Sequence, residues 1–522
     1  RTVEVTVGTR AKIDVTLEVD SEQLEETVVV GYGSQKKESL TAAISQVKSE
    51  DITSTKQTNL VASLQGKVPG LQIRQRSGKP GTFDTDLSLR GFGQPLVIID
   101  GVARTAQARD GEWGYWMNEG GAAALSQLNP EDIESISVLK DAAAAVYGLD
   151  AANGVILVTT KQGQKGKTKV NYDFSYGWQN PWRKPSVLNA TEYAIMMNEG
   201  YINSGSAPVY DNPYEFGEGT DWVGLIFNNN APVMKHDLNI SGGSDKLTYS
   251  TSFGYLSREG TIGGNYGRSN YDRFTVRQTL NSVLFDNTAD RSWLNKMTFN
   301  TNVSYAHINS TGISNNSEFA SPLGSALGMS PLLDVYATPE EEEAYKTMYP
   351  EGYAHIVRDA TGRAYTVVDG NVYNEQTHPL ASLSLPGTKY DTDKFIVNGA
   401  AEINIWDNLK FRSSVGIDLA FWGNHGYTKQ YFLSSKSYNY NTVASETTYD
   451  KDGNATTTEK INYAESAQQE MNRALRWQVE NVISYDKTFG QHSIAAVLGQ
   501  TAIRSTSSNV GANARGLMYP YD

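Results

Sequence analysis

The chain has 522 residues, a formal net charge of −13 at pH 7 and no cysteine. This length exceeds that of one ordinary domain, and the lack of thiols excludes disulfides and thiolate metal sites. The negative balance argues against nucleic acid as a partner, because surfaces that bind DNA or RNA are basic. The 30 Tyr, 15 Phe and 9 Trp, together with many turn-forming residues, favour strands over helices.

This composition is compatible with a membrane protein. The sequence has no run of about 18 apolar residues, so no transmembrane helix is predicted. Strands of a membrane barrel need only about 9–11 residues with one apolar face. The mean hydropathy of −0.45 therefore does not distinguish a barrel from a soluble β-protein.

The first 38 residues precede the two main units. Residues 1–20 alternate Val, Ile and Leu with polar residues and predict the last hairpin of a small β-sandwich. Residues 21–38 predict a linker with an acidic start, a short Val run and a Gly-Tyr-Gly break. The run Thr27, Val28, Val29 and Val30 is β-prone, and no neighbouring segment has an obvious strand pattern to pair with it. Such a run is a candidate edge for a strand from another chain.

Residues 39–163 predict a compact α+β unit in which short apolar strands alternate with Gly- and Pro-rich turns. Asn129 is a plausible N-cap, with Pro130 at the first helical position. The predicted strands and helix are Leu96–Gly101, which ends in an Asp-Gly turn, Ser135–Lys140, a short helix Ala142–Tyr147 capped by Asp141, and Gly154–Lys161.

Residues 164–522 change to long strands of strict alternation, many with aromatic side chains on one face. We expect about nine strands, with the length and two-residue period of membrane β-strands. Two connections, Ser241–Lys246 and Asp486–His492, predict tight hairpin turns, whereas Ser310–Thr392 predicts a long polar excursion. Short turns on one side and long loops on the other are typical of a membrane barrel. The clearest alternating runs lie in Val170–Tyr176, Leu247–Tyr255, Met297–Tyr305, Leu409–Phe421 and Leu475–Tyr485.

The stretches "LEETVVVGYGSQKK", "SLQGKVPGLQI", "LSLRGFG", "PLVIIDGV", "LNPEDIESISVLKDAAAAVYGLDAANGVILVTTKQG" and "LNISGGSDKLTYSTSFGYLSREG" carry a family resemblance. With them the chain resembles the SusC/RagA family of TonB-dependent outer-membrane transporters of Bacteroidetes. The resemblance implies a mainly β fold with an N-terminal α+β plug inside an antiparallel transmembrane β-barrel of about 22 strands. It further implies that residues 1–20 end a carboxypeptidase-regulatory-like β-domain. The end "GLMYPYD" is not an amphipathic final strand, so we expect only the first part of the barrel in this chain.

The resemblance also implies a function and partners. The expected activity is TonB-dependent import of a nutrient, an oligosaccharide first, across the bacterial outer membrane. A SusD-like surface lipoprotein would act as a lid, TonB with its ExbB/ExbD complex would supply energy, and transporter–lipoprotein pairs would form dimers. The plug and linker would face the periplasm, with Thr27–Val30 as the TonB box. The alternatives are an oligopeptide importer of the same family and a non-transporting all-β surface protein.

Two sets of plug residues are candidates for function. Aromatic faces with charged neighbours suit stacking on sugars and polar contacts to hydroxyl groups, although these aromatics could instead pack the loop against the barrel. The second set, Arg90, Asp100 and Lys140, predicts internal salt bridges and turn capping that hold the plug in the barrel. The candidate cargo contacts in the loop Ala103–Gly121 are Arg104, Arg109, Asp110, Trp113, Tyr115 and Trp116.

Signals for enzymes and metals are weak. The six His are far apart and none lies in an H-E-x-x-H pattern, and no G-x-S-x-G motif occurs. "GQKGKT" lacks the first glycine of a P-loop, and "DKDGN" lacks the spacing of a calcium loop and predicts a hairpin turn instead. We therefore expect no enzymatic activity, no cofactor and no metal site.

Overall fold

The computed structural model describes residues 27–30, 33–36, 44–55, 57–75, 78–81, 85–104, 124–125, 127–140, 144, 147–313, 317, 321–373, 376–490 and 492–517. The predicted sandwich hairpin at residues 1–20 lies outside this part of the chain. No helix in the described part is long and apolar enough to cross a membrane.

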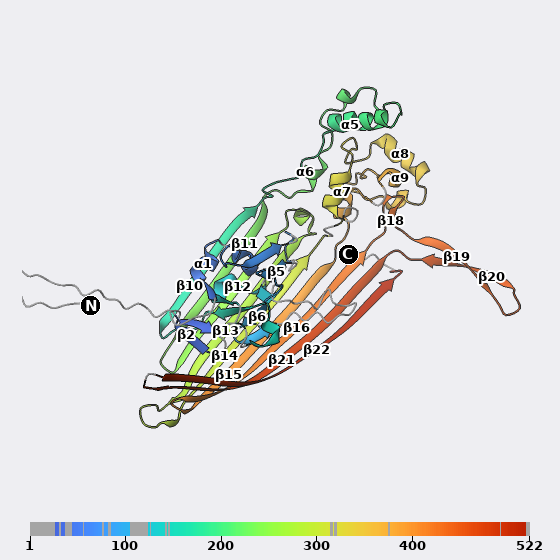
Figure 1. Cartoon of the computed structure of the whole chain (residues 1–522). Coiled ribbons are helices and arrows are strands. Elements are labelled where there is room, and N and C mark those ends of the chain that lie inside the picture. Colours follow the sequence, from blue (N-terminus) through green and yellow to red (C-terminus); the bar gives the residue numbers. More distant parts are fainter. Residues whose placement is uncertain are drawn as a thin grey trace, which may run out of the picture.

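Nine long antiparallel strands form one curved sheet, here called the wall (Figure 1). Its order follows the chain, with β10 and β22 at opposite edges. The prediction of about nine strands is confirmed. The strands of the wall are β10 (Gly166–Gln179), β11 (Ala231–Gly243), β12 (Leu247–Glu259), β13 (Asn270–Asp286), β14 (Trp293–Thr311), β15 (Lys389–Trp406), β16 (Leu409–Thr428), β21 (Ser466–Phe489) and β22 (His492–Arg515).

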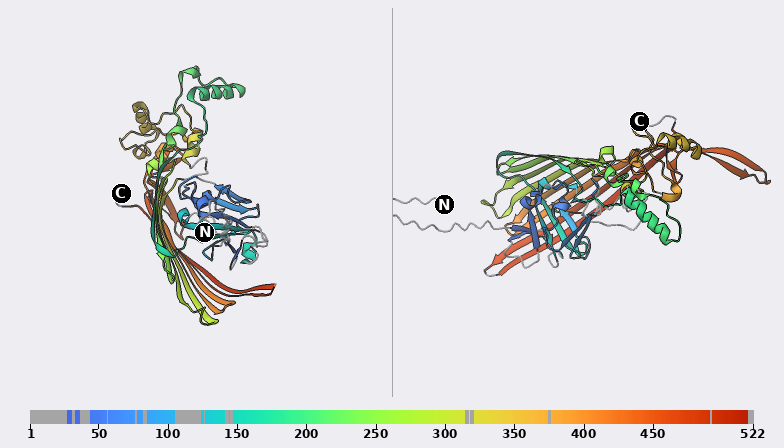
Figure 2. Two further views of the ribbon diagram at one scale, coloured as in Figure 1. Left: turned by 90° about the vertical axis from the view of Figure 1, so that its left-hand side faces the viewer. Right: turned by 90° about the horizontal axis from the view of Figure 1, so that it is seen from above.

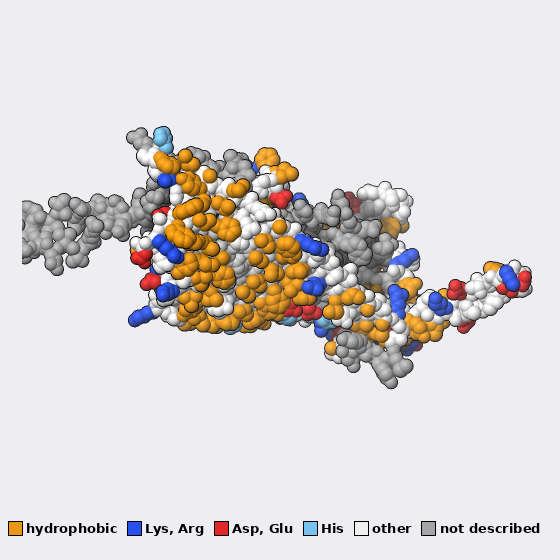
Figure 3. Space-filling model, turned by 90° about the horizontal axis from the view of Figure 1, so that it is seen from below, with side chains coloured by type: hydrophobic (Ala, Val, Ile, Leu, Met, Phe, Trp, Pro, Cys, Tyr) orange, Lys and Arg blue, Asp and Glu red, His pale blue; other side chains and the backbone are white. Residues whose placement is uncertain are grey.

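The two faces of the wall differ as the alternation predicts. On β16, Gly416 and Asp418 point to the plug side, so the odd-numbered residues point away from it. Most of those residues are apolar, and Val415, Ile417 and Phe421 are exposed. They meet apolar partners across the strands, as where Ile417 pairs with Val397. The outer face is therefore covered with apolar side chains, which Figure 3 shows in orange.

Connections at the two ends of the wall have very different lengths. The predicted hairpin turns are confirmed, because β12 begins four residues after the end of β11, and only residues 490–491 separate β21 from β22. At the other end the connections span residues 180–230, 312–388 and 429–465 and contain several helices (Figure 1). This asymmetry is that of a membrane barrel.

Residues 44–161 form the plug, which lies in the hollow of the curved wall (Figure 2). Its main sheet has the order β3-β8-β9-β6-β7, in which only β6 and β9 run parallel. Two apolar core clusters hold it together, and both contain plug residues alone. The plug elements are β3 (Ile44–Lys48), α1 (Ser49–Thr53), α2 (Leu60–Ser63), β4 (Leu71–Gln75), β5 (Thr85–Leu89), β6 (Leu96–Ile99), β7 (Val102–Arg104), η2 (Pro130–Asp132), β8 (Ile133–Leu139), η4 (Leu149–Ala151) and β9 (Val155–Thr160).

The local predictions for the plug are confirmed where the structure describes them. Strand β6 ends in the Asp-Gly turn, and Asp100 has a φ of 48°, which Asp tolerates better than most residues. The side chain of Asn129 caps η2 by accepting a hydrogen bond of 3.2 Å from the Glu131 N–H. Most of the predicted helix Ala142–Tyr147 lies outside the described residues.

The prediction that Thr27–Val30 lacks a neighbouring strand partner is wrong. These residues form β1 (Thr27–Val30), which pairs antiparallel with β2 (Gly33–Lys36). The connection has two residues, the length of the tightest hairpins. Four polar residues show no alternation, so Gly33–Lys36 carries no strand signal of its own.

The long connections are more than the polar loop that the sequence predicts. Described residues of 180–230, 321–388 and 429–440 pack together into what we call the cap, whose core joins Trp222, Met329, Tyr365 and Leu433. A hairpin of β19 and β20 projects from it, and the predicted turn at Asp450–Asn454 is confirmed. The elements are α5 (Ala190–Asn203), η5 (Pro213–Glu215), α6 (Trp222–Ile226), η6 (Gly264–Tyr266) between β12 and β13, α7 (Pro322–Gly328), α8 (Pro339–Met348), η7 (Tyr353–His355), α9 (Gly370–Tyr373), α10 (Pro379–Leu383), β17 (Tyr431–Ser434), β18 (Ser437–Asn439), β19 (Thr442–Tyr449) and β20 (Ala455–Asn462).

The cap contains a buried histidine that must stay neutral. His378 Nδ1 accepts a hydrogen bond of 3.1 Å from the Ala381 N–H at the start of α10, and Nε2 lies 2.9 Å from the Val335 carbonyl oxygen. Burial lowers the pKa of His378 to about 4. A second proton would place an N–H at Nδ1, facing the Ala381 N–H.

The cap is therefore expected to lose stability as the pH falls from 6.5 towards 4. In that pH range the histidine is protonated in the unfolded cap but stays neutral in the folded cap. This difference lowers the free energy of unfolding by on the order of 3 kcal/mol. Hydrogen exchange of peptides covering α10, corrected for the intrinsic pH dependence of exchange, would measure this loss. His378→Asn keeps a capping side chain without a titrating group and should flatten the profile, whereas His492→Asn, at an exposed turn, should not. An unchanged profile in His378→Asn would contradict the assignment.

Candidate functional site: contacts between plug and wall

Asp100 forms the first bridge between plug and wall. Within the plug, its carboxylate accepts hydrogen bonds from the Thr160 N–H at 3.0 Å and the Thr160 hydroxyl at 2.8 Å. From the wall, Arg277 Nη2 lies 3.0 Å away on β13 and Asn302 Nδ2 donates at 2.5 Å from β14. Arg277 also donates to the Thr160 hydroxyl. One carboxylate thus closes the plug turn and ties the plug to two wall strands.

Asp132 lies beside this bridge, at the end of η2. Burial raises the pKa of its carboxyl group, and the charge of Arg277 opposes that shift only in part. Its carbonyl oxygen accepts a hydrogen bond of 2.8 Å from the Lys161 N–H. Arg277 Nη1 lies 3.5 Å from the same carbonyl oxygen, so Arg277 contacts polar plug atoms from both Asp132 and Thr160.

Arg104 forms the second bridge, at the end of β7. Its guanidinium is paired with the carboxylate of Asp418 on β16, and Lys394 Nζ on β15 lies 3.8 Å from the same carboxylate. The Arg104 side chain is only 4% exposed. We expected Arg104 on an exposed loop; that placement is wrong, because Val102–Arg104 pairs with β6 as a strand.

A third bridge joins the start of η2 to β11. Asn129 Nδ2 donates to Asp237 Oδ1 at 2.5 Å. Lys235 Nζ lies 3.0 Å from Asp237 and 3.5 Å from Glu131. With Asp173, these carboxylates form the one group in the described residues whose oxygens could surround a cation. The buried ammonium of Lys235 supplies positive charge to that group.

The interface as a whole is polar. The plug clusters contain no wall residue, and the apolar clusters of the wall and cap contain no plug residue. A cavity of about 40 Å³ between the two bodies, lined in part by Asn302, Lys394 and Asn398, has room for water. Directional bonds rather than a shared apolar core hold the plug in place, which is the character of an interface that can open.

Of the remaining candidate residues, Arg90 and Lys140 make contacts within the plug, and the others lie outside the described part of the chain. Arg90 has a φ of 53°, and its N–H donates to the Gly70 carbonyl at 2.7 Å, as expected for a residue in a turn. Lys140 Nζ donates to Ser45 Oγ at 2.8 Å and to the Pro69 carbonyl at 2.6 Å, which joins three segments of the plug. The loop residues Arg109, Asp110, Trp113, Tyr115 and Trp116 lie outside the described residues.

Comparison with known proteins agrees with this architecture. The model of the TonB-dependent receptor plug domain matches residues 36–155. TonB-dependent receptor SusC of Bacteroides thetaiotaomicron is 29% identical over 446 residues, which are 83% of this chain and 40% of that protein. The chain is thus similar to SusC-type TonB-dependent receptors over most of its length. Members of this family are outer-membrane proteins, and the relatives are receptors and importers rather than enzymes.

Two further comparisons agree with this similarity. TonB-dependent receptor P26 of Formosa agariphila is 34% identical over 292 residues, which are 54% of this chain and 27% of that protein. The solved structure of the RagAB peptide importer in the open-open state shares the fold, with a TM-score of 0.64 at 20% identity, and the match covers 95% of this chain and 51% of that one. This chain therefore spans about half, or less, of the length of these relatives.

The sequence did not reveal the wall residues of the three bridges. Arg277, Asp418 and Lys235 are charged residues on strands whose other faces are apolar. Such a charge on the inner face of a membrane strand is a signal that a plug or a channel faces it. The pattern could have marked these residues but not their partners, because Asp418 lies 314 residues from Arg104 in the chain.

Proposed function

We propose that this protein imports a nutrient across the bacterial outer membrane in a TonB-dependent cycle. The polar interface between plug and wall carries the proposal. A plug with its own core can move as a body once the bridges at Asp100, Arg104 and Asn129 open. A permanent structural core would instead share apolar side chains with the wall.

Force would enter through Thr27–Val30. Among the described residues β1 pairs with β2 alone, so its other edge can accept a strand of TonB. In Figure 1, β2 lies on the side of the plug away from the helices of the cap, which supports a TonB box on the periplasmic side and a cap on the outer side. Cargo binding at the outer side would shift the linker population towards a form that TonB can reach. TonB, energised by ExbB/ExbD, then pulls the plug.

The proposed cargo is an oligosaccharide, received together with a SusD-like surface lipoprotein that closes the outer side. Arg109, Asp110, Trp113, Tyr115 and Trp116 supply the mixture of aromatic and polar groups that binds sugars. An oligopeptide is the second candidate, since the RagAB peptide importer has the same fold. Such transporter–lipoprotein pairs would assemble as dimers.

The test is uptake by cells that carry the full-length protein, compared with a strain lacking its gene. Labelled oligosaccharides and oligopeptides are supplied separately, each with and without a protonophore. We expect uptake of one cargo class to fall to the level of the deletion strain when the protonophore removes the energy source of TonB. If the protonophore abolishes uptake of oligopeptides alone, the cargo is an oligopeptide and the proposed mechanism of energised import stands. Uptake that resists the protonophore would contradict energised import, and unchanged uptake after deletion would favour a non-transporting surface protein.

A further inference from the structure

The outer face of the wall changes from apolar to charged as its strands approach the cap. On β15 the last aromatic residue of the apolar face is Phe395. Next to it Asp393 lies 2.9 Å from His307 Nδ1, and Asp391, one step further, lies 3.2 Å from His425 Nδ1. Charged and polar pairs beyond an apolar band are typical of the level where lipid headgroups begin.

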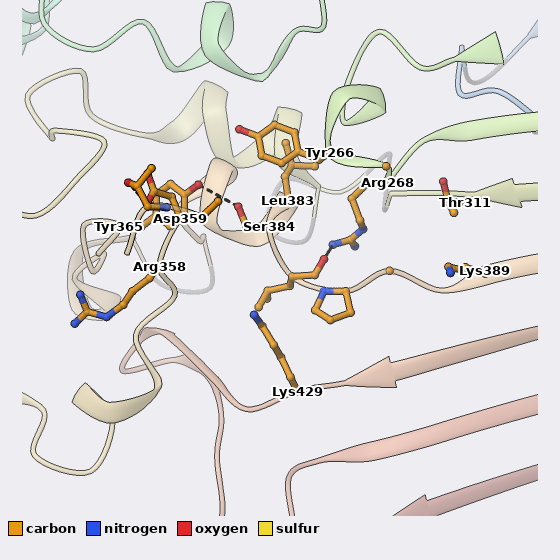
Figure 4. A pocket seen from close by; sticks show the side chains of 16 residues that line it. Tyr266, Arg268, Thr311, Arg358, Asp359, Tyr365, Leu383, Ser384, Lys389 and Lys429 are labelled. Carbon is orange, nitrogen blue, oxygen red and sulfur yellow. Dashed lines mark hydrogen bonds between the residues drawn. The ribbon is translucent and has the colours of Figure 1, made fainter. Parts of the chain in front are cut away.

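A cavity of about 640 Å³ lies just beyond this row, between the strand ends and the cap. Its size is that of pockets for small organic ligands. Figure 4 shows Arg268 before β13, Lys389 at the start of β15 and Lys429 after β16 around it, with Tyr365 and Ser384 from the cap. The charged residues of its lining are Arg268, Arg358, Lys389, Lys429 and Asp359.

Two of these cations are available for a ligand. Arg358 is ion-paired with Glu342, and the carboxylate of Asp359 is held by Arg363 at 2.8 Å. Within the described part of the chain, the ammonium groups of Lys389 and Lys429 have no ion-pair partner. The cavity therefore offers an excess of positive charge to a solute.

Lys389 lies on the outer face of the wall. On β15, Lys394 and Asn398 face the plug, so the odd-numbered Lys389 faces away from it. Lys389 pairs with Thr311 and His425 in one row of the sheet. It lies four residues beyond Asp393, which for strands tilted by about 45° is roughly 10 Å further from the apolar band. Cargo passes on the plug side, so this position favours a ligand from the membrane.

We propose that this cavity binds the phosphorylated headgroup of an outer-leaflet lipid. Lys389 and Lys429 contact the phosphate, and the half-buried Tyr266 provides a flat face for a sugar or glycerol moiety. The inference rests on the membrane placement of the wall and not on the identity of the cargo. A lipid held here joins β13, β15, β16 and the cap at their meeting point.

The test is lipid binding by the purified full-length receptor, followed by native mass spectrometry in detergent. The probes are lipid A, inorganic phosphate and an oligosaccharide that contains uronic acids. The variant is the double substitution Lys389→Gln and Lys429→Gln. The matched control is Lys451→Gln and Lys460→Gln, which removes the same charge from the exposed β19–β20 region.

We expect lipid A to bind the wild type and the control alike, and the double variant about tenfold more weakly. If the double variant and the control bind lipid A equally well, Lys389 and Lys429 do not form the lipid site. If inorganic phosphate binds as tightly as lipid A, the cavity is a site for small anions and the lipid assignment is wrong. Tighter binding of the acidic oligosaccharide would make the cavity a cargo site instead. None of these outcomes depends on uptake, so the inference can fail while the proposed import stands.

Discussion

Replacing Val29 with proline is expected to abolish uptake while cargo binding at the cell surface stays unchanged. Proline has no N–H to donate and its ring fixes φ, so it cannot lie within a strand that pairs with a strand of TonB. Val29 is the third residue of β1, where it pairs with Ser34. Surface binding uses the opposite side of the membrane and should not respond.

The matched control is Val29→Thr. Threonine keeps the β-branched shape and the backbone donor, and strand addition depends mainly on the backbone. Labelled cargo bound to cells in the presence of a protonophore reports surface binding, and accumulation without it reports uptake. Accumulation at the wild-type rate in the proline variant would show that TonB does not engage Thr27–Val30.

Replacing Asp100 with asparagine is expected to loosen the plug. The amide keeps the shape and tolerates the positive φ of 48°, but the Arg277 guanidinium, only 7% exposed, loses its ion-pair partner. Leaving one member of a buried ion pair alone costs about 3 kcal/mol. Opening of the plug should then become more frequent by on the order of 100-fold.

Planar bilayers containing the purified full-length receptor would measure this change as the urea concentration at which conductance appears. Asp245→Asn provides the control, because it removes an ion pair of 2.8 Å with Lys165 whose members are 66% and 89% exposed. Such an exposed pair contributes little to stability. If Asp100→Asn opens at the same urea concentration as the wild type, the Asp100 bridge does not hold the plug.

The features that the sequence predicted correctly depend on neighbouring residues. The alternation on β16 and the Asp-Gly turn after β6 are visible in a few consecutive residues, because the side-chain period of a strand is a local property. The cap was missed for the opposite reason. Its core takes Trp222, Met329 and Leu433 from three separate connections, and no local pattern shows that these connections meet.

For the contacts between plug and wall, the sequence indicated residues of the plug but not their partners on the wall. Asp100 was identified as a residue that holds the plug, but its partners Arg277 and Asn302 lie 177 and 202 residues away. Arg104 was expected to meet cargo because it adjoins an aromatic loop in sequence, yet β7 turns its side chain to the wall. Pairing across such separations depends on how the plug is seated, which no local pattern encodes.

The separate cores of the plug and the wall have a consequence for biogenesis. Every residue of the two plug clusters lies between Ile44 and Val158, ahead of the first wall strand at Gly166. The plug can therefore complete its folding before any wall strand enters the bilayer. Asp100 and Arg104 are then already positioned when Arg277 and Asp418 arrive, so the bridges need no rearrangement of the plug core.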